Sequence, residues 1–212
     1  MTSRLFYDFI TLLAVINPIE AAATFATLTG RRSAAEQVQI ARRASVTALA
    51  ILVVFGFVGG GLLTALGIGF PAFRIAGGLL LFCVGFKMVF ARETGTQELS
   101  ADEQAHAVST DDPSVFPLAI PIITGPGALT TIVALMSKRH EAPLEYVGVV
   151  VISVVVLFIT YWTMREARWL TKAFGPSGIN AVGRIMGIIV AAIAIQLILD
   201  GLVEVFPILN RA

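Results

Sequence analysis

The chain has 212 residues, of which 57% are hydrophobic and 14% are charged, and its formal net charge is +1. With a mean hydropathy of +0.86, it has too little polar surface to cover a soluble globular fold. The near-neutral charge, together with the lack of a basic cluster carrying interleaved aromatic residues, excludes the usual nucleic-acid-binding proteins.

Six apolar runs in the sequence are long enough to cross a membrane, which takes about 20 residues. They cover residues 5–29, 44–66, 73–90, 115–137, 146–164 and 181–202. No clear cleavage site follows the first run, so we expect it to be retained as a span. The sequence therefore predicts an all-α membrane protein with six transmembrane helices and both termini on one side.

The basic residues indicate the orientation, because cytoplasmic loops carry an excess of Lys and Arg. The first, third and fifth connections hold most of them: Arg31, Arg32, Arg42, Arg43, Arg92, Arg165, Arg168 and Lys172. We therefore expect a multi-pass protein of the cell (inner) membrane, surrounded by lipid, with both termini extracytoplasmic.

The two halves of the chain resemble each other. Arg-Ile-Ala-Gly at 74–77 and Arg-Ile-Met-Gly at 184–187 are 110 residues apart, and Pro18 and Pro126 are 108 apart. Residues 1–91 and 115–212 would each form three spans, joined by an acidic cytoplasmic linker at 92–114. Because each half would cross the membrane three times, an odd number, the second half would enter the membrane from the side opposite to the first. This pattern predicts a 3+3 inverted repeat.

Proline interrupts the first and fourth apolar runs near their middle. Because it lacks an N–H and clashes with the preceding turn, Pro18 and Pro126 should break their helices, with Asn17 or Gly125 as the N-cap of a new helix. Helices 1 and 4 are thus predicted to be discontinuous. Paired interruptions at corresponding positions of two halves are typical of the binding region of inverted-repeat transporters.

The half-helices that follow the two interruptions would aim unpaired N–H groups and positive dipole ends at one central volume. A carboxylate suits such a volume, and the small and hydroxylated neighbours leave room for a small ligand. The predicted substrate-binding residues are Asn17, Pro18, Glu20, Thr24, Gly125, Pro126, Gly127, Thr130 and Thr131. The alternative is that proline and glycine only kink these helices for packing.

Two carboxylates in the spans are candidates for ion coupling, because an ionisable group at membrane depth is costly and usually functional. Glu20 is either a proton- or ligand-linked carboxyl or the third residue of a capping box with Asn17. Asp200 shares a helix face with Gln196 and could form an ion pair with Arg74. These alternatives remain open at the level of sequence.

The sequence gives no sign of an enzyme. No Ser/His/Asp or Cys/His arrangement places a nucleophile and a base within the spans, and we expect no metal site and no cofactor. The single cysteine, Cys83, excludes an internal disulfide and is expected to be a small buried hydrophobe.

Five segments together resemble the MarC family over essentially the whole chain. They are Asn-Pro-Ile at 17–19, Phe-Arg-Ile-Ala-Gly-Gly at 73–78, Pro-Leu-Ala-Ile-Pro at 117–121, Gly-Pro-Gly at 125–127 and the Arg-Ile-Met-Gly at 184–187. The functionally assigned branch of that family transports small neutral amino acids, so the resemblance implies glycine- or alanine-like substrates. Family members commonly have a small or hydroxylated residue at the position of Glu20, where this chain departs from the pattern.

The expected function is a secondary transporter of small neutral amino acids that works by rocking of its two halves. No nucleotide-binding P-loop is present, so a proton or sodium gradient should drive it. The alternatives are a non-transporting membrane scaffold or sensor with a partner on the acidic segment at 92–112, and a channel or efflux protein for other small solutes. A homo-oligomer is left open.

Overall fold

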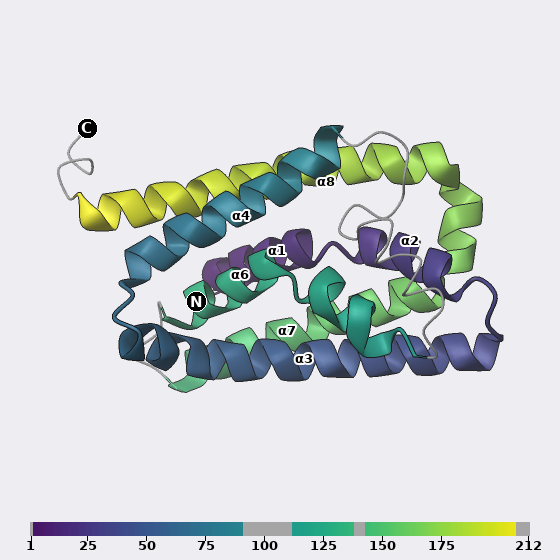
Figure 1. The fold of residues 1–212 in the computed structure, drawn as a ribbon, viewed down its shortest axis with the longest axis horizontal. Helices are drawn as coiled ribbons and strands as arrows, with labels where there is room; N and C mark the ends of the chain where they lie inside the picture. Colours follow the sequence, from purple (N-terminus) through teal and green to yellow (C-terminus); the bar gives the residue numbers. More distant parts are fainter. Residues whose placement is uncertain (1, 91–111, 138–142, 207–212) are drawn as a thin grey trace.

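The computed structural model describes residues 2–90, 112–137 and 143–206, and every regular element in these ranges is helical (Figure 1). The all-α prediction is therefore confirmed for this part of the chain. The predicted linker at 92–114 lies outside the described residues except for 112–114. The elements in chain order are α1 (Thr2–Ile16), α2 (Pro18–Thr29), α3 (Ala34–Ala65), α4 (Phe70–Phe90), η1 (Ser114–Ile123), α6 (Pro126–Ser137), α7 (Pro143–Arg165) and α8 (Ala167–Val205).

Five stretches are long and apolar enough to cross a membrane, and a sixth is added if η1 and α6, which meet at a bend of 63°, form one span. The five are Arg4–Thr29, Ala34–Ala65, Phe70–Phe90, Glu145–Arg165 and Ser177–Val205. They run along the long axis of the molecule, and the start of α1 and the end of α8 lie toward the end where α3 turns into α4 (Figure 1). This arrangement agrees with the predicted multi-pass fold.

The stretch formed by α1 and α2 is the most interior of these five. About half of its apolar window (56%) is buried, against 28–39% for the other four. In α6 every residue from Gly127 to Met136 except Leu129 is buried. The elements with the predicted interruptions therefore lie at the centre, and α3, α4, α7 and α8 have broad outward faces.

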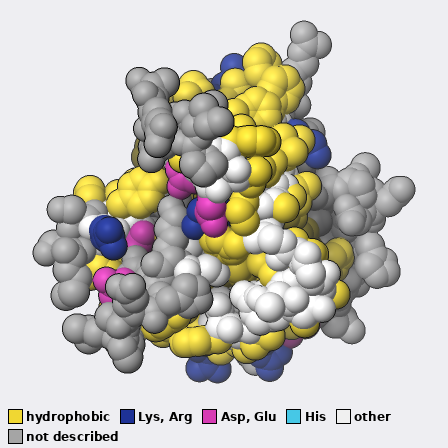
Figure 2. Space-filling model, turned by 90° about the vertical axis from the view of Figure 1, so that its left-hand side faces the viewer, with side chains coloured by type: hydrophobic (Ala, Val, Ile, Leu, Met, Phe, Trp, Pro, Cys, Tyr) yellow, Lys and Arg dark blue, Asp and Glu magenta, His cyan; other side chains and the backbone are white. Residues whose placement is uncertain are grey.

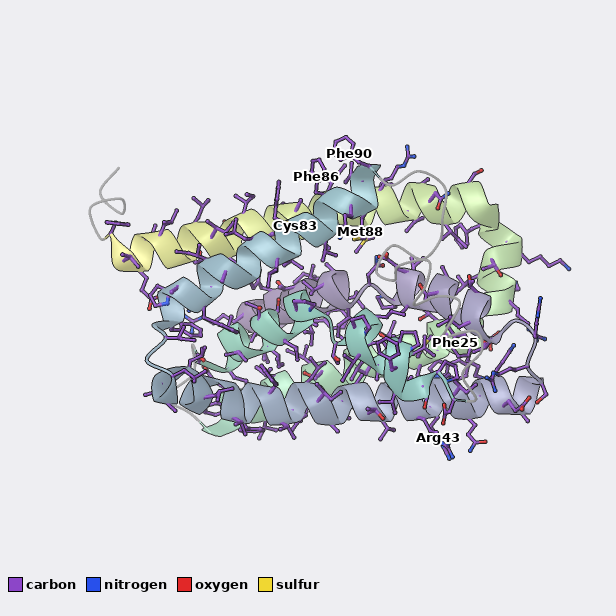
Figure 3. All side chains as sticks on the ribbon, viewed as in Figure 1. Phe25, Arg43, Cys83, Phe86, Met88 and Phe90 are labelled. Carbon is purple, nitrogen blue, oxygen red and sulfur yellow. The ribbon has the colours of Figure 1, made fainter. Side chains whose placement is uncertain are left out.

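Those outward faces are hydrophobic, which suits lipid better than water. Phe86 and Phe90 point away from α4, whereas Met88 points inward and Phe25 lies among the helices (Figure 3). Figure 2 shows hydrophobic side chains over much of one end of the molecule, with charged groups only in small clusters.

Cys83 lies on the outer face of α4 and is exposed. The prediction that its side chain is buried is therefore wrong.

The connection predicted at 31–43 is instead helical from Ala34 onward. Ser33 is the N-cap of α3: its Oγ accepts a hydrogen bond from the Glu36 N–H (3.3 Å), and its own N–H donates to Glu36 Oε2 (2.8 Å). This capping box starts the helix well before the apolar run begins.

The connection predicted at 165–180 is helical for most of its length. α8 begins at Ala167 and changes direction at Gly175, whose φ of 62° and ψ of 173° are accessible essentially only to glycine. The residues before this turn belong to a short amphipathic stretch, with Trp169 exposed, rather than to a loop.

Glycines bring helix backbones into direct contact. A Cβ placed on Gly85 of α4 would lie 2.8 Å from the Gly187 carbonyl oxygen of α8, and one on Gly187 would lie 2.9 Å from that of Gly85. Gly59 of α3 instead makes room for a side chain, since a Cβ there would lie 2.5 Å from Cγ2 of Val133 in α6. Such small-residue contacts are the usual basis of helix association in lipid.

Candidate functional site

The first interruption is the single residue Asn17, which separates α1 from α2 and has a left-handed conformation (φ 49°, ψ 76°). The first backbone hydrogen bond of α2 joins the Ala21 N–H to the Asn17 carbonyl (3.1 Å). Pro18 has no N–H, so the N–H groups of Ile19 and Glu20 precede the first bond of the helix. This end of α2 therefore has two donors that the helix itself does not use.

The side chain of Glu20 accepts a hydrogen bond from the Asn17 amide nitrogen (2.8 Å). Glu20 thus bonds back to the cap residue, as the capping alternative expected, but through the Asn17 side chain; Asn17 itself makes no side-chain capping bond, so the reciprocal capping box does not form. The physical reason is the backbone: an N-cap side chain reaches the first turn from an extended conformation, and Asn17 is left-handed.

A small cavity lies beside the half-buried Glu20, between α2, α4 and α8. Its volume is about 30 Å³, and its walls include Ala23, Met88 and Asn180. A cavity of this size holds one or two water molecules. Glu20 thus borders a small space between three helices of the bundle.

The second interruption lies between η1 and α6, which meet at 63°. The first backbone bond of α6 runs from the Leu129 N–H to the Gly125 carbonyl (3.1 Å), so the N–H groups of Gly127 and Ala128 precede it. One turn further, the hydroxyl of Thr131 is buried and has no hydrogen-bond partner among the residues that the structure describes. The start of α6 therefore also has two N–H donors that its own helix does not use.

Gly127 brings the two interruptions close together. A Cβ at this position would overlap the Leu81 side chain of α4 and would lie 3.4 Å from Val15, two residues before Asn17. The protein's own packing therefore occupies the space beside Gly127. Thr130 packs in the same way against Gly77 of α4 and donates its hydroxyl hydrogen to the Pro126 carbonyl (2.8 Å).

The nine predicted substrate-binding residues differ in their exposure. Glu20 and Gly125 are half-buried and Pro126 is exposed, while the others are buried: Asn17, Pro18, Thr24, Gly127, Thr130 and Thr131. Sequence reasoning missed Thr163 of α7, whose hydroxyl donates to the Pro18 carbonyl (3.1 Å). The two residues are 145 positions apart, so no local pattern could have indicated this contact.

Asp200, the second coupling candidate, lies near the end of α8, where Gln196 donates to its Oδ1 (2.8 Å). The predicted Arg74–Asp200 ion pair is wrong: Arg74 Nη1 contacts Glu204 Oε2 instead (2.6 Å). Gly201 packs against α4, since a Cβ there would lie 2.9 Å from the Pro71 carbonyl oxygen. Glu204, three residues on, shares that helix face and reaches the arginine.

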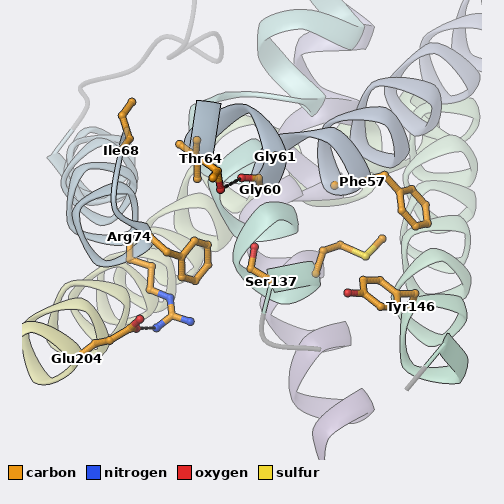
Figure 4. Close-up of a pocket in the computed structure, with 13 residues that line it drawn as sticks. Phe57, Gly60, Gly61, Thr64, Ile68, Arg74, Ser137, Tyr146 and Glu204 are labelled. Carbon is orange, nitrogen blue, oxygen red and sulfur yellow. Dashed lines mark hydrogen bonds and ion pairs between the residues drawn. The ribbon is translucent and has the colours of Figure 1, made fainter. Parts of the chain in front are cut away.

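This ion pair lies in a pocket of about 770 Å³ formed by parts of α3, α4, α6, α7 and α8 (Figure 4). Phe57, Ser137 and Tyr146 are among its other lining residues. No sequence pattern indicates this pocket, because its walls come from five elements whose relative positions depend on the packed fold.

Comparison with known proteins agrees with this architecture. The family described as "MarC family integral membrane protein" matches residues 2–206. The UPF0056 membrane protein YvbG of Bacillus subtilis is 34% identical over 210 residues, covering 99% of each chain. YhcE of Escherichia coli, also named a UPF0056 membrane protein, is 29% identical over 203 residues, covering 95% of this chain and 93% of its own. No solved structure matches. The chain therefore belongs to the MarC family of integral membrane proteins.

Proposed function

We propose that this protein is a secondary transporter that carries small neutral amino acids, such as glycine and alanine, across the cell membrane. The observation that carries the proposal is the pair of interior helix starts at Pro18 and Pro126. Each has two backbone N–H groups ahead of the first helical bond, and Val15 and Gly127 bring the two starts close together. Helix N-termini of this kind bind carboxylates.

The proposal includes an inverted repeat, in which α1 with α2 and η1 with α6 are the discontinuous spans of the two halves. Both second half-helices begin with proline and have the same length of 12 residues. The third spans of the two halves, α4 and the later part of α8, cross at Gly85 and Gly187. A rocking motion of one half against the other would open the central site to each side in turn.

The space at the interruptions favours a small substrate. Ala21 and Ala22 follow the first interruption, both almost fully buried at 1% and 2% exposure, and the cavity beside Glu20 has only about 30 Å³. A long side chain would have to displace packed helices. A glycine- or alanine-sized solute needs the smallest rearrangement, and the members of the family with an assigned function have substrates of this class.

Glu20 offers a physical route for coupling. Glu20 lies in the first turn of α2. When its carboxylate is charged, it competes with a substrate carboxylate for the positive end of the helix. Protonation removes the competing charge, so the proton and the substrate would bind together. Asp200 is the second coupling candidate, and sodium is the alternative ion.

Competition for uptake tests the carboxylate site. Proteoliposomes that contain the purified chain are supplied with radiolabelled glycine, and unlabelled L-alanine or L-alaninamide is added as competitor. Losing a charge-assisted hydrogen bond costs about 1.5–3 kcal/mol, so the amide should compete at least about tenfold more weakly. Equal competition by the acid and the amide would contradict a site that recognises the carboxylate.

A further inference from the structure

The pocket that contains Arg74 and Glu204 is separate from the helix interruptions, since none of the nine predicted substrate-binding residues lines it. Its walls combine the glycine-rich end of α3 with the stacked rings of Phe57 and Tyr146, whose centroids are 6.1 Å apart. Its volume of about 770 Å³ and its mixture of apolar walls with few polar groups are typical of small-molecule sites.

Arg74 is the unusual residue of this pocket. It is only 7% exposed, although a buried charge is costly unless it is well paired. Its Nη1 contacts Glu204 Oε2 (2.6 Å), and its Cζ lies 4.3 Å from the centroid of the Phe70 ring. Its Nε is buried and has no hydrogen-bond partner within the described part of the chain.

A guanidinium has five N–H donors in a planar fork, and Glu204 contacts only one of its nitrogens. Figure 4 shows the Arg74 guanidinium turned toward the pocket, with a second nitrogen directed away from Glu204. The side chain of Glu204 is 45% exposed, so it is open to exchange of partners. The pair thus offers one accessible negative group and a cation with unused donors in the same space.

We propose that this pocket is a second binding site, for a small zwitterion whose carboxylate binds Arg74 and whose ammonium binds Glu204. The zwitterion replaces one ion pair by two, so no charge is left unpaired. A carboxylate alone would bring a second negative charge beside Glu204, and an amine alone would bring a second positive charge beside Arg74. The identity of the solute as an amino acid rests on the proposed transport function, whereas the recognition of two charges rests on the pocket itself.

The headgroup of phosphatidylethanolamine carries the same combination of an anionic group and an ammonium. We assign the pocket to a soluble zwitterion rather than to the lipid headgroup, because its walls include the hydroxyls of Thr64 and Ser137 and three glycines of α3. Lipid composition is therefore one arm of the experiment.

Thiol protection tests the site in the full-length chain. A Cys83→Ser background removes the native thiol, and Ser137→Cys places a nearly isosteric thiol in the pocket wall. The rate of labelling by a small water-soluble methanethiosulfonate is measured with L-alanine, L-alaninamide or propionate present. Only L-alanine, which carries both charges, should slow the labelling.

Two variants should have opposite effects. Arg74→Gln should raise the alanine concentration needed for protection at least about tenfold. Glu204→Gln frees the arginine from its partner, so propionate should now protect. Arg184 is the corresponding arginine of the second half and is exposed, so Arg184→Gln is the matched control and should behave like the parent. Size-exclusion profiles check that each variant is folded.

Other results would contradict either this site or the transport proposal. Full alanine protection in Arg74→Gln, or no gain for propionate in Glu204→Gln, would reduce the ion pair to a structural contact between α4 and α8. Protection that occurs in detergent but is lost in phosphatidylethanolamine vesicles would assign the pocket to the lipid headgroup. Protection without any uptake would contradict the transport proposal and leave this site standing, while uptake with unchanged protection in Arg74→Gln would contradict this site alone.

Discussion

At the first helix interruption, the Glu20 carboxylate is held by the Asn17 side chain (2.8 Å) and not by the backbone of its own helix. This contact replaces the reciprocal capping box, which was one of the two alternatives for Glu20, by a bond between the two side chains. It also makes glutamine a good test residue, because its side-chain oxygen can accept the same hydrogen bond while carrying no charge and no exchangeable acid proton.

Glu20→Gln should therefore separate coupling from binding. If Glu20 carries the coupling proton, the variant should still exchange internal for external labelled alanine but should no longer accumulate it when a pH gradient is imposed. Exchange and pH-driven uptake are measured on the same proteoliposomes, and Asp200→Asn tests the second coupling candidate in the same way. Full pH-driven accumulation by Glu20→Gln would rule out the coupling role of this residue.

Gly127 shows how one atom at the junction affects stability. A Cβ here overlaps Leu81, which is itself only 1% exposed, so Gly127→Ala should destabilise the protein by about 1–3 kcal/mol through overpacking. Gly61→Ala, where a Cβ meets nothing within 4 Å, should be neutral or gain up to about 1 kcal/mol from helix propensity. Thermal unfolding in detergent compares the two, and Leu81→Ala should partly rescue Gly127→Ala. Equal stabilities of the two glycine variants would show that Gly127 does not pack against the Leu81 side chain.

At the scale of elements, the length of the apolar runs predicted the helices well, because spanning a bilayer requires about 20 residues. The start of α3 was missed although its signal is local: Ser33 and Glu36 have the spacing of a capping box. The early part of α8 was missed because basic residues such as Arg168 and Lys172 favour a loop unless the neighbouring helices are known.

Contacts between distant elements could not be predicted from the sequence. Arg74 and Glu204 are 130 positions apart, and which acidic residue of α8 meets the arginine depends on the register that Gly201 sets against α4. Proline and glycine patterns did indicate where helices begin, at Pro18 and Pro126, because those residues act on the local backbone.

For the whole molecule, the distribution of Lys and Arg predicts an orientation that the fold alone does not give. The start of α1 and the end of α8 lie toward the end of the long axis where α3 turns into α4 (Figure 1). The first and fifth connections lie at the other end and hold six of the twelve arginines of the chain. A C-terminal fusion to a reporter that is active only in the cytoplasm should stay inactive. A fully active reporter would reverse the orientation.

In the proposed function, this helix bundle couples an ion gradient to the movement of a small amino acid. The most direct measurement is uptake of radiolabelled alanine by proteoliposomes of the purified chain, with a proton or a sodium gradient imposed and dissipated by an ionophore as the control. The proposal predicts accumulation above the external concentration with one of the two gradients and its loss when the ionophore is added. Uptake no greater than that of protein-free liposomes under both gradients would contradict it.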